Sequence, residues 1–384
     1  MTLTARPGLG SAGTAGTPHP HSGGTPHPHK VEAVAPGGAV FPTRLRAWHV
    51  AAGVLFLLCS LLASVLVGPY HLPPAQVLAA LAAKIPLLHV RSGLGALGNA
   101  DVWQIRAPSA VLGGLVGAML AVAGASYQGV FSNPLADPYL LGVAAGAGLG
   151  ATVAIVYGPA AWATSLSPLP IAAFVGAVAA VAATFALGRS RSRSRSPAFL
   201  VLAGVAVAAF FTAVQTFIAQ RQNSGDLEVV YNWILGGLST AGWAPVELIA
   251  PYVAVSAAVL LACRRLLDAL SVGDEEASSF GVRADRARLV VVVAATLGTA
   301  AAVSVSGLIG FVGIIVPHTI RLLAGPSYRR IIPLSLLFGA GFLVLANLAA
   351  GAVLSPEQIP LGVVTAFLGA PFFLVVLRQS RRMG

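Results

Sequence analysis

Ten apolar stretches make up most of this chain, and acidic residues are nearly missing from them. Most stretches are about 20 residues long, the length that a helix needs to cross the hydrocarbon core of a bilayer. Polar and apolar positions do not alternate within them, which disfavours the strands of a membrane barrel. The sequence therefore predicts an all-α polytopic membrane protein with about ten spans, at 48–68, 107–131, 138–157, 169–188, 197–219, 244–262, 287–308, 312–324, 331–353 and 361–378.

The distribution of charge supports this map and orients it. Charged residues make up 9% of the chain, against about 25% in a soluble protein. If both termini are cytoplasmic, the basic residues on the outside are Lys84, Arg91, Arg106 and Arg221, and all others lie inside. Cytoplasmic loops collect Lys and Arg, so we expect a multi-pass protein of a bacterial cytoplasmic membrane with both termini inside. The net charge of +11 has the same origin and does not indicate a nucleic-acid partner.

Two further stretches do not have the pattern of a span. Residues 227–242 are semi-apolar and end in glycines, which indicates a short re-entrant helix. Residues 1–47, rich in Gly, Pro and His, predict a disordered cytoplasmic tail before a transmembrane domain at 48–384. The repeated TPHPH of this tail can bind a divalent metal, and the alternative is a tail without an essential role. The four histidines concerned are His19, His21, His27 and His29.

Signatures of catalysis or of an internal energy source are missing from the sequence. The chain has two lysines and no G-x-x-x-x-G-K-[ST] phosphate loop, and it has no H-E-x-x-H zinc motif. Carriers driven by ion gradients usually need carboxylates within the membrane, and here the acids fall at span ends or in loops. We therefore predict no catalytic residue, cofactor or metal site, and an energy source on a cytoplasmic partner.

The stretch SVGDEEASSFGV, at 271–282, is unusually acidic for this chain. It places three acids side by side on the cytoplasmic side, between the sixth and seventh spans. Carboxylates at a helix N-terminus favour helix formation, and the small residues that follow allow close approach of another protein. The stretch is interpreted either as a docking element or as a solvated loop.

Two motifs early in the chain make local predictions. In NPLADPYLLG, at 133–142, prolines interrupt a continuous helix, and Asn133 and Asp137 are expected to accept backbone hydrogen bonds. Asp137 precedes Pro138 and is expected to be the N-cap of the next helix. Gly142, Gly146 and Gly150 have the spacing that allows close helix packing.

Five linked stretches together carry a family likeness. They are VWQIRAPSAVLGGLVGAMLAVAGASYQGVFSNPLADPYLLGVAAGAGLGA (102–151), NWILGGLSTAGW (232–243), LSVGDEEASSFGV (270–282), VSGLIGFVGIIVPHTIRLLAGPSYRRIIPLS (305–335) and QIPLGVVTAFLGAPFFLVVL (358–377). In order and spacing they resemble the permease subunits of type II ABC importers for ferric siderophores, haem and cobalamin, the FecCD or BtuC-like family. The resemblance covers about residues 48 to 380.

The resemblance implies a permease dimer, two separate ATPase subunits below it and a substrate-binding protein outside. The chain itself would not be an enzyme. Arg106 would help to dock the binding protein, with a membrane-surface anchor beside Trp103 as the alternative. The coupling loop would press into the ATPase through Gly273, Asp274, Glu275, Glu276, Ala277, Ser278, Phe280 and Gly281. The fifth span and the re-entrant helix would line the path, with Gln215, Gln220, Asn223 and Asn232 as polar candidates.

One departure from the family pattern bears on the partner and the substrate. Many relatives carry a second outer Arg, often with an Asp, near the end of the ninth span, where this chain has Asn347 and Gly351. The dimer could therefore be a homodimer or a heterodimer with a second permease. The relatives that combine two unlike permease subunits are mostly siderophore systems, which favours a ferric siderophore as substrate over cobalamin or haem. A secondary transporter and a non-transporting scaffold are the rivals from other classes.

Overall fold

The computed structural model describes residues 45–68, 70–84, 92–158, 168–188, 197–238, 242–279, 281, 283–354 and 357–380. These residues belong to one compact unit, Phe41–Gly384, and every regular element within them is a helix. The expected tail and its four histidines lie almost entirely outside the described residues. The helices are α1 (Ala47–Leu66), α2 (Pro74–Ala82), α3 (Ala96–Ala100), the π-helix η1 (Asp101–Arg106), α4 (Ala107–Val130), α5 (Val143–Tyr157), α6 (Leu169–Gly188), α7 (Pro197–Ala219), α8 (Ser224–Leu235), α9 (Ala244–Leu270), α10 (Asp274–Ser279), α11 (Ala284–Ser306), α12 (Val312–Ala324), α13 (Tyr328–Ala352) and α14 (Leu361–Ser380).

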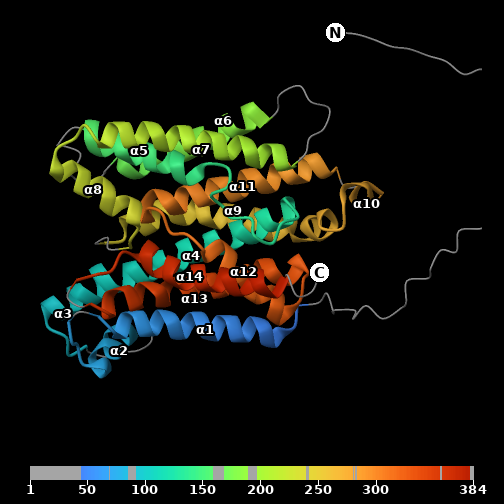
Figure 1. Ribbon diagram of the computed structural model, residues 1–384. Coiled ribbons are helices and arrows are strands. Elements are labelled where there is room, and N and C mark those ends of the chain that lie inside the picture. Colours follow the sequence, from blue (N-terminus) through green and yellow to red (C-terminus); the bar gives the residue numbers. More distant parts are fainter. Residues whose placement is uncertain are drawn as a thin grey trace, which may run out of the picture. The chain divides into compact units, whose positions relative to one another are not determined.

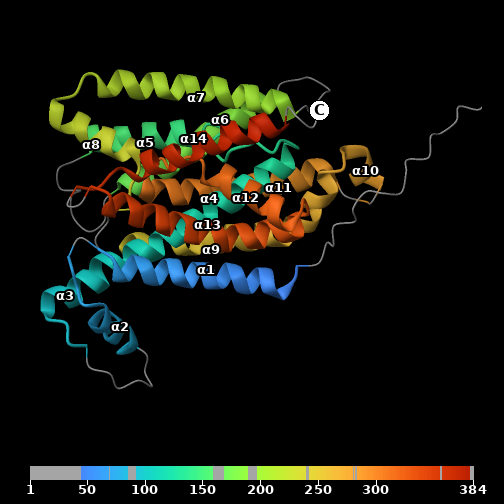
Figure 2. The same cartoon turned by 60° about the horizontal axis from the view of Figure 1, so that its bottom comes forward.

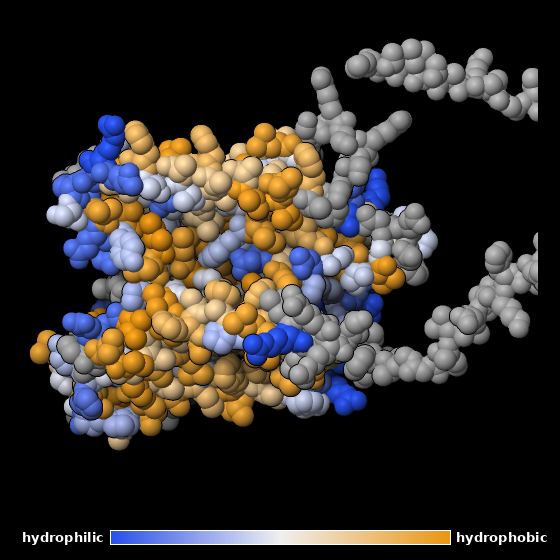
Figure 3. All heavy atoms as spheres, viewed as in Figure 1, coloured by the Kyte–Doolittle hydropathy of each residue, from blue (hydrophilic) through white to orange (hydrophobic). Residues whose placement is uncertain are grey.

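Each of the ten expected spans corresponds to one of these helices. In the described part of the chain, seven helices are long and apolar enough to cross a membrane, and α5, α12 and α14 are shorter apolar helices. The long helices run side by side (Figure 1). On the face seen in Figure 3, hydrophilic residues gather at the two ends and hydrophobic residues cover the band between them. This is the surface of an all-α polytopic membrane protein.

Helix α4 forms the centre of the core and buries nearly its whole circumference. It packs against α13, α11, α9 and α12, and it lies inside the bundle in both views (Figures 1 and 2). Its glycines allow this crowding, because a Cβ at Gly117 would collide with the Gly339 carbonyl and one at Gly124 with the Gly313 carbonyl. Backbones can therefore approach closely, as in other membrane helix pairs with small residues at the interface.

The predicted glycine stripe of 142–150 is confirmed as a packing surface. A Cβ at Gly146 would collide with the Gly176 carbonyl of α6, and one at Gly150 with the Ala172 carbonyl of the same helix. Gly142 differs, because it has a φ of +85° and ends a turn before α5 begins. The stripe therefore consists of two packing glycines and one conformational glycine.

The turn before α5 corrects one detail of the sequence prediction. Asn133 Oδ1 accepts from the Leu135 amide (2.9 Å) and Asp137 Oδ1 from the Tyr139 amide (2.8 Å), as expected. Asp137 is nevertheless not an N-cap, because α5 begins at Val143, five residues later than the predicted span. The intervening residues are held elsewhere: the Tyr139 hydroxyl donates to the Ile309 carbonyl (3.0 Å) and accepts from the Ile309 amide (3.1 Å).

The two ends of the bundle carry different elements (Figures 1 and 2). Helices α2 and α3 and the start of α8 lie at one end, called the η1 end below, and α10 lies at the other, called the α10 end. Helix α8 runs back from the η1 end and stops at Gly236, where the Gly237 amide donates to Ser306 and the Leu361 amide donates to Gly236. It corresponds to the short helix predicted at 227–242, although it begins at Ser224 and ends at Leu235.

Candidate functional site

Within the acidic stretch at 271–282, residues Asp274–Ser279 form the short helix α10, at the α10 end of the bundle. Gly273 (φ +138°) and Gly281 (φ +76°) flank it in backbone conformations that favour glycine. Ala277 is fully buried and packs with Leu270 of α9 and Ala287 of α11. The helix is therefore attached to the ends of two long helices, while Ser278 and Ser279 are exposed. The side chains of Asp274, Glu275 and Glu276, and all of Phe280, lie outside what the structure describes.

Directly before α10, a carboxylate of α9 holds the start of α13. Asp268 Oδ2 accepts from Ser327 Oγ (3.0 Å), and Asp268 Oδ1 accepts from the Tyr328 amide (2.5 Å). Arg329 Nε lies 3.2 Å from Asp268 Oδ2 and completes an ion pair. These residues, Asp268 and 327–329, are called the Asp268 cluster below. A carboxylate in this position satisfies free amides and suits the positive end of the helix dipole.

A second set of polar contacts begins where the Asp268 cluster ends. Arg321 Nη2, on α12, donates to the Tyr328 hydroxyl (3.2 Å) and to Gln128 Oε1 of α4 (3.1 Å). Gln128 Nε2 in turn donates to the Gly313 carbonyl (3.1 Å), near the start of α12. The α10 end is thus cross-linked by directional bonds among α4, α9, α12 and α13.

An open apolar groove of about 600 Å³ lies where α8 ends. It combines the end of α8, the turn between α11 and α12, and one face of α14. Phe367 is 76% exposed, so the groove lies on the surface of the single chain. Such a wall offers dispersion contacts and few fixed polar partners. The lining residues are Ile234, Leu235, Leu308, Gly362, Val363, Ala366, Phe367, Ala370 and Pro371.

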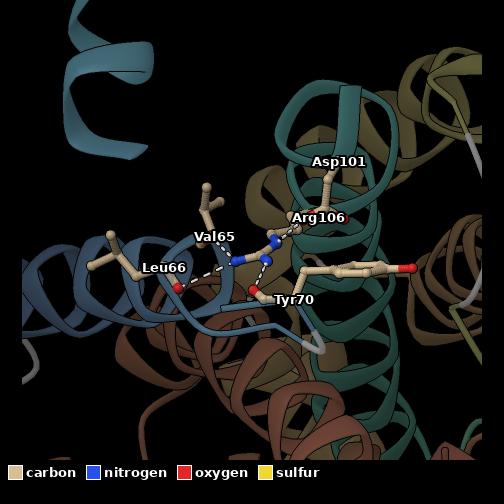
Figure 4. A network of polar contacts seen from close by, with 5 residues as sticks. All are labelled: Val65, Leu66, Tyr70, Asp101 and Arg106. Atoms are coloured by element: carbon tan, nitrogen blue, oxygen red, sulfur yellow. Dashed lines mark hydrogen bonds and ion pairs between the residues drawn. The ribbon is translucent and has the colours of Figure 1, made fainter. Parts of the chain in front are cut away.

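Arg106, the expected docking residue, is buried at the η1 end and 5% exposed. Its Nε donates to Asp101 Oδ2 (2.7 Å), its Nη1 to the Val65 and Leu66 carbonyls (3.2 Å each) and its Nη2 to the Tyr70 carbonyl (2.6 Å). Figure 4 shows the guanidinium turned toward these groups. Arg106 therefore fastens the end of α1 to η1. Docking through this charge stays a prediction, and it requires part of this network to open.

The sequence analysis did not foresee the π-helix that carries Arg106. Its Trp103 carbonyl accepts from Trp243 Nε1 (3.0 Å), and its Gln104 carbonyl accepts from the Gly242 amide (2.7 Å). These bonds tie η1 to the segment that follows α8. Such π-helices are rare and often occur at functional sites. The residues of 101–106 are ordinary helix formers, so their sequence carries no signal of the irregular register.

The four polar candidates for the path are not brought together. Gln215 is buried on α7 and packs against Gly148 of α5. Gln220, Asn223 and Asn232 are exposed, and Asn223 Oδ1 accepts from the Asp226 amide (2.9 Å), which caps α8. None of these four described residues lines the groove. Their role in the path stays a prediction, and the groove residues are the ones that sequence reasoning missed.

The position where relatives carry an outer acid is internal in this chain. Asn347 Nδ2 donates to Ser109 Oγ (3.2 Å), and Ser109 Oγ donates to the Leu238 carbonyl (3.2 Å). This short chain of bonds joins α13, α4 and the segment after α8. Asn347 therefore contributes to internal contacts rather than to a charged outer surface.

The helical bundle, the short helix α10, the apolar groove and the buried Arg106 together define a class of protein. The described chain matches a solved structure described as a metal-chelate type ABC transporter in an inward-facing conformation, with a TM-score of 0.74 and 26% identity. The match covers 86% of this chain and 98% of the other. A polytopic helical bundle of this kind, with a short surface helix at one end, is the permease subunit of an ABC importer.

The sequence relatives define the family. The model of the FecCD transport family matches residues 55–379. The cobalamin import permease BtuC of Halobacterium salinarum is 43% identical over 72% of this chain and 73% of its own length. The iron(3+)-hydroxamate import permease FhuB of Bacillus subtilis is 36% identical over 73% of this chain and 72% of its own length. The chain belongs to the FecCD transport family.

Membership of this family carries several consequences. The chain is a multi-pass protein of the inner membrane and is not itself an enzyme, because ATP hydrolysis belongs to a separate subunit. As the permease of an ABC importer it works as part of a permease dimer with ATPase and binding-protein partners. The family resemblance found in the sequence is confirmed. The relatives import different substrates, so the family as a whole covers more than one class of cargo.

Proposed function

We propose that this chain forms the path by which a ferric siderophore crosses the membrane, by alternating access powered by the separate ATPase. The observation that carries the proposal is the apolar groove between α8 and α14, whose residues offer few fixed polar partners to a cargo. A bulky metal chelate can pass such a wall through weak dispersion contacts. Selection among chelates is then left to the binding protein.

The orientation proposed here places the α10 end and both termini in the cytoplasm. Many arginines lie at that end, whereas Lys84 and Arg221 are the exposed cations described at the η1 end. This asymmetry follows the positive-inside rule. The binding protein would then dock at the η1 end, and α10 would contact the ATPase. The arginines at the α10 end include Arg264, Arg265, Arg283, Arg286, Arg288, Arg321, Arg329 and Arg330.

Coupling is proposed to act through α10. Because Ala277 is buried against α9 and α11, a displacement of α10 by the ATPase would displace the ends of these two long helices directly. Ala277, one of the residues expected at the contact, is fully buried and instead attaches α10 to the bundle. The remaining expected contact residues are Gly273, Asp274, Glu275, Glu276, Ser278, Phe280 and Gly281, and the placement of Phe280 lies outside the described residues. A homodimer would place two copies of the groove around one path, and a heterodimer with a second permease is the alternative.

Cobalamin is the second candidate substrate. It is favoured by the identity of 43% to the cobalamin permease of Halobacterium salinarum, against 36% to the iron(3+)-hydroxamate permease. The groove does not discriminate between the two cargoes, because both are bulky chelates. Haem is a further member of the same chemical class.

The test is uptake in cells with and without the chain. Radiolabelled iron is supplied as a ferric hydroxamate siderophore, alone and with excess cobalamin or haem, and labelled cobalamin is supplied in parallel. We expect iron uptake to be lost on deletion and to resist both competitors. Loss of cobalamin uptake with normal iron uptake would move the substrate to cobalamin. Uptake that persists without the ATPase would contradict the whole proposal.

A further inference from the structure

The geometry points to Asp268 as a positioning residue that transmits displacement of α10 to the wall of the groove. This inference rests on the proposed function, in which α10 receives the motion of the ATPase and the groove is the path. It adds a residue outside the expected coupling loop, and it assigns that residue a transmitting role rather than contact with the ATPase.

Helix α10 is attached to the end of α9 by apolar packing. Ala277 of α10 and Leu270 of α9 are both buried, and they form one small cluster with Ala287. Asp268 lies two residues before Leu270, in the last turn of the same helix. A displacement of α10 therefore moves the backbone that carries Asp268.

Asp268 is bound to the start of α13 by hydrogen bonds and an ion pair. Its two oxygens receive Ser327 Oγ, the Tyr328 amide and Arg329 Nε, three donors in the first turn of that helix. The apolar contact nearby is of another kind, because Leu267 packs against the open face of Gly129 beside the Tyr328 ring. Apolar surfaces can slide, whereas charge-assisted hydrogen bonds fix distance and direction. Asp268 thus makes α13 follow α9.

Further contacts lead from α13 to the groove. Tyr328 is 5% exposed, and its hydroxyl accepts a hydrogen bond from Arg321. Arg321 also donates to Gln128 Oε1, and Gln128 Nε2 donates to the Gly313 carbonyl. Two residues before Gly313, Phe311 has a φ of +68° and its ring lies against Gly369 of α14. Helix α14 forms one wall of the groove. The contacts are continuous from α10 to this wall.

A purely structural role is the alternative, in which Asp268 only caps α13. The two roles differ in what Asp268→Ala would change. A cap contributes to stability whether or not ATP is present, whereas a transmitting contact changes how much motion and transport each ATP produces. The experiment therefore measures coupling in the assembled transporter, with stability as a separate readout.

The experiment uses the permease with its ATPase and binding protein in proteoliposomes. For D268A we expect substrate transported per ATP hydrolysed to fall about five- to tenfold, the lower end of typical coupling effects. D268N keeps one oxygen that can accept from the Tyr328 amide, but its NH2 group cannot accept from Ser327 Oγ, and it loses the ion pair with Arg329, so its ratio should lie between those of D268A and the wild type. Ser271→Ala is the matched control, because Ser271 is exposed and its hydroxyl donates to the backbone carbonyl of Asp268 and not to the carboxylate. An unchanged ratio in D268A would overturn the inference.

Two additions keep the test decisive. If D268A does not assemble, Tyr328→Phe removes only the hydroxyl that contacts Arg321, and it should still lower the ratio, by about twofold or more. A spin label at position 367 in both copies reports the ATP-dependent opening of the groove without any assumption about substrate. We expect D268A to lose most of that distance change. A normal change would contradict the inference, whereas wild-type transport of cobalamin instead of iron would contradict only the proposed substrate.

Discussion

Arg106 shows how a charge at the end of a predicted span can become part of the interior. Asp101 lies five residues earlier, and in an α-helix residues five apart point in different directions. The π-helix changes this, because its backbone bonds join residues five apart. Arg106 Nε then lies 2.7 Å from Asp101 Oδ2, with both side chains nearly inaccessible.

Replacing Arg106 with Ala should destabilise the protein strongly. Asp101 would keep a buried charge without its partner, which costs about 3–5 kcal/mol. Thermal unfolding in detergent measures the loss, and D101N/R106A should recover part of it. If stability were unchanged and affinity for the binding protein fell, more at low salt than at high salt, the docking role would be supported instead.

Asp137 provides a pH-dependent prediction in the connection between α4 and α5. Burial raises the pKa of its carboxyl from 3.8 to about 6, although the Tyr139 amide opposes the shift. The folded state therefore binds this proton more tightly than the unfolded state. The stability involved is present in full below pH 3.8 and is lost as the pH rises to about 6.

Asp137→Asn should remove this loss, because Asn keeps the acceptor for the Tyr139 amide without the charge. At pH 7 we expect a gain of roughly 1–3 kcal/mol, reduced by the partial exposure of the side chain. Thermal unfolding between pH 4 and 7 should be flatter in the variant than in the wild type. Parallel curves would show that Asp137 titrates normally.

At the scale of elements, small residues decide how the helices pack. Ten apolar runs predict ten helices, but they do not say which helix is central. Helix α4 takes that place because its glycines and alanines let α12 and α13 approach its backbone. Dispersion contacts and close packing replace the hydrophobic effect inside a bilayer, so these surfaces carry much of the stability.

Two glycines of α4 give a matched pair of variants. Gly124→Ala should cost about 1–3 kcal/mol, because the new Cβ collides with the Gly313 carbonyl and must push α12 away. Gly114→Ala should be tolerated, since its Cβ would meet only the Ala340 Cβ at 4.0 Å. Thermal stability and yield of the purified permease measure both. Equal losses in the two variants would contradict the packing argument, because Gly→Ala by itself favours the helix.

At the scale of the whole molecule, the proposed mechanism requires the two ends and the groove to act together. The α10 end is cross-linked by the Asp268 cluster and by Arg321, and the η1 end is cross-linked by Arg106 and the π-helix carbonyls. The groove between them is walled by apolar residues. This arrangement suits rigid movements of helices, driven at one end and opening a path between them.

Replacing Asp274, Glu275 and Glu276 together with Ala should lower ATP-driven uptake while membrane insertion stays normal. We expect a loss of about fivefold or more in uptake, the size of a typical coupling effect. The isosteric Asn and Gln replacements separate charge from shape, because they retain the side-chain outline. If uptake in the Ala variant equals that of the wild type, the interpretation of the stretch as a docking element is wrong and that of a solvated segment is supported.

How much could be predicted differs between fold and site. The ends of α6 and α7 agree with the predicted spans to the residue, because apolar run length is a local property. The predicted start of α5 was wrong by five residues. The turn at 131–142 is stabilised by a hydrogen bond from the Tyr139 hydroxyl to the carbonyl of Ile309, which is distant in sequence. The polar path candidates could be chosen only by residue type, and their surroundings depend on packing.

The sequence by itself determined the membrane class, the spans, the re-entrant helix and the position of α10. Each follows from the hydrophobicity, charge or glycine content of one continuous segment. Only the tertiary structure decided the apolar groove, the burial of Arg106 and the hold of Asp268 on α13. Asp268 meets Tyr328 across 60 residues of sequence, and Arg106 meets Tyr70 across 36. Such contacts depend on which helices become neighbours, which no single segment specifies.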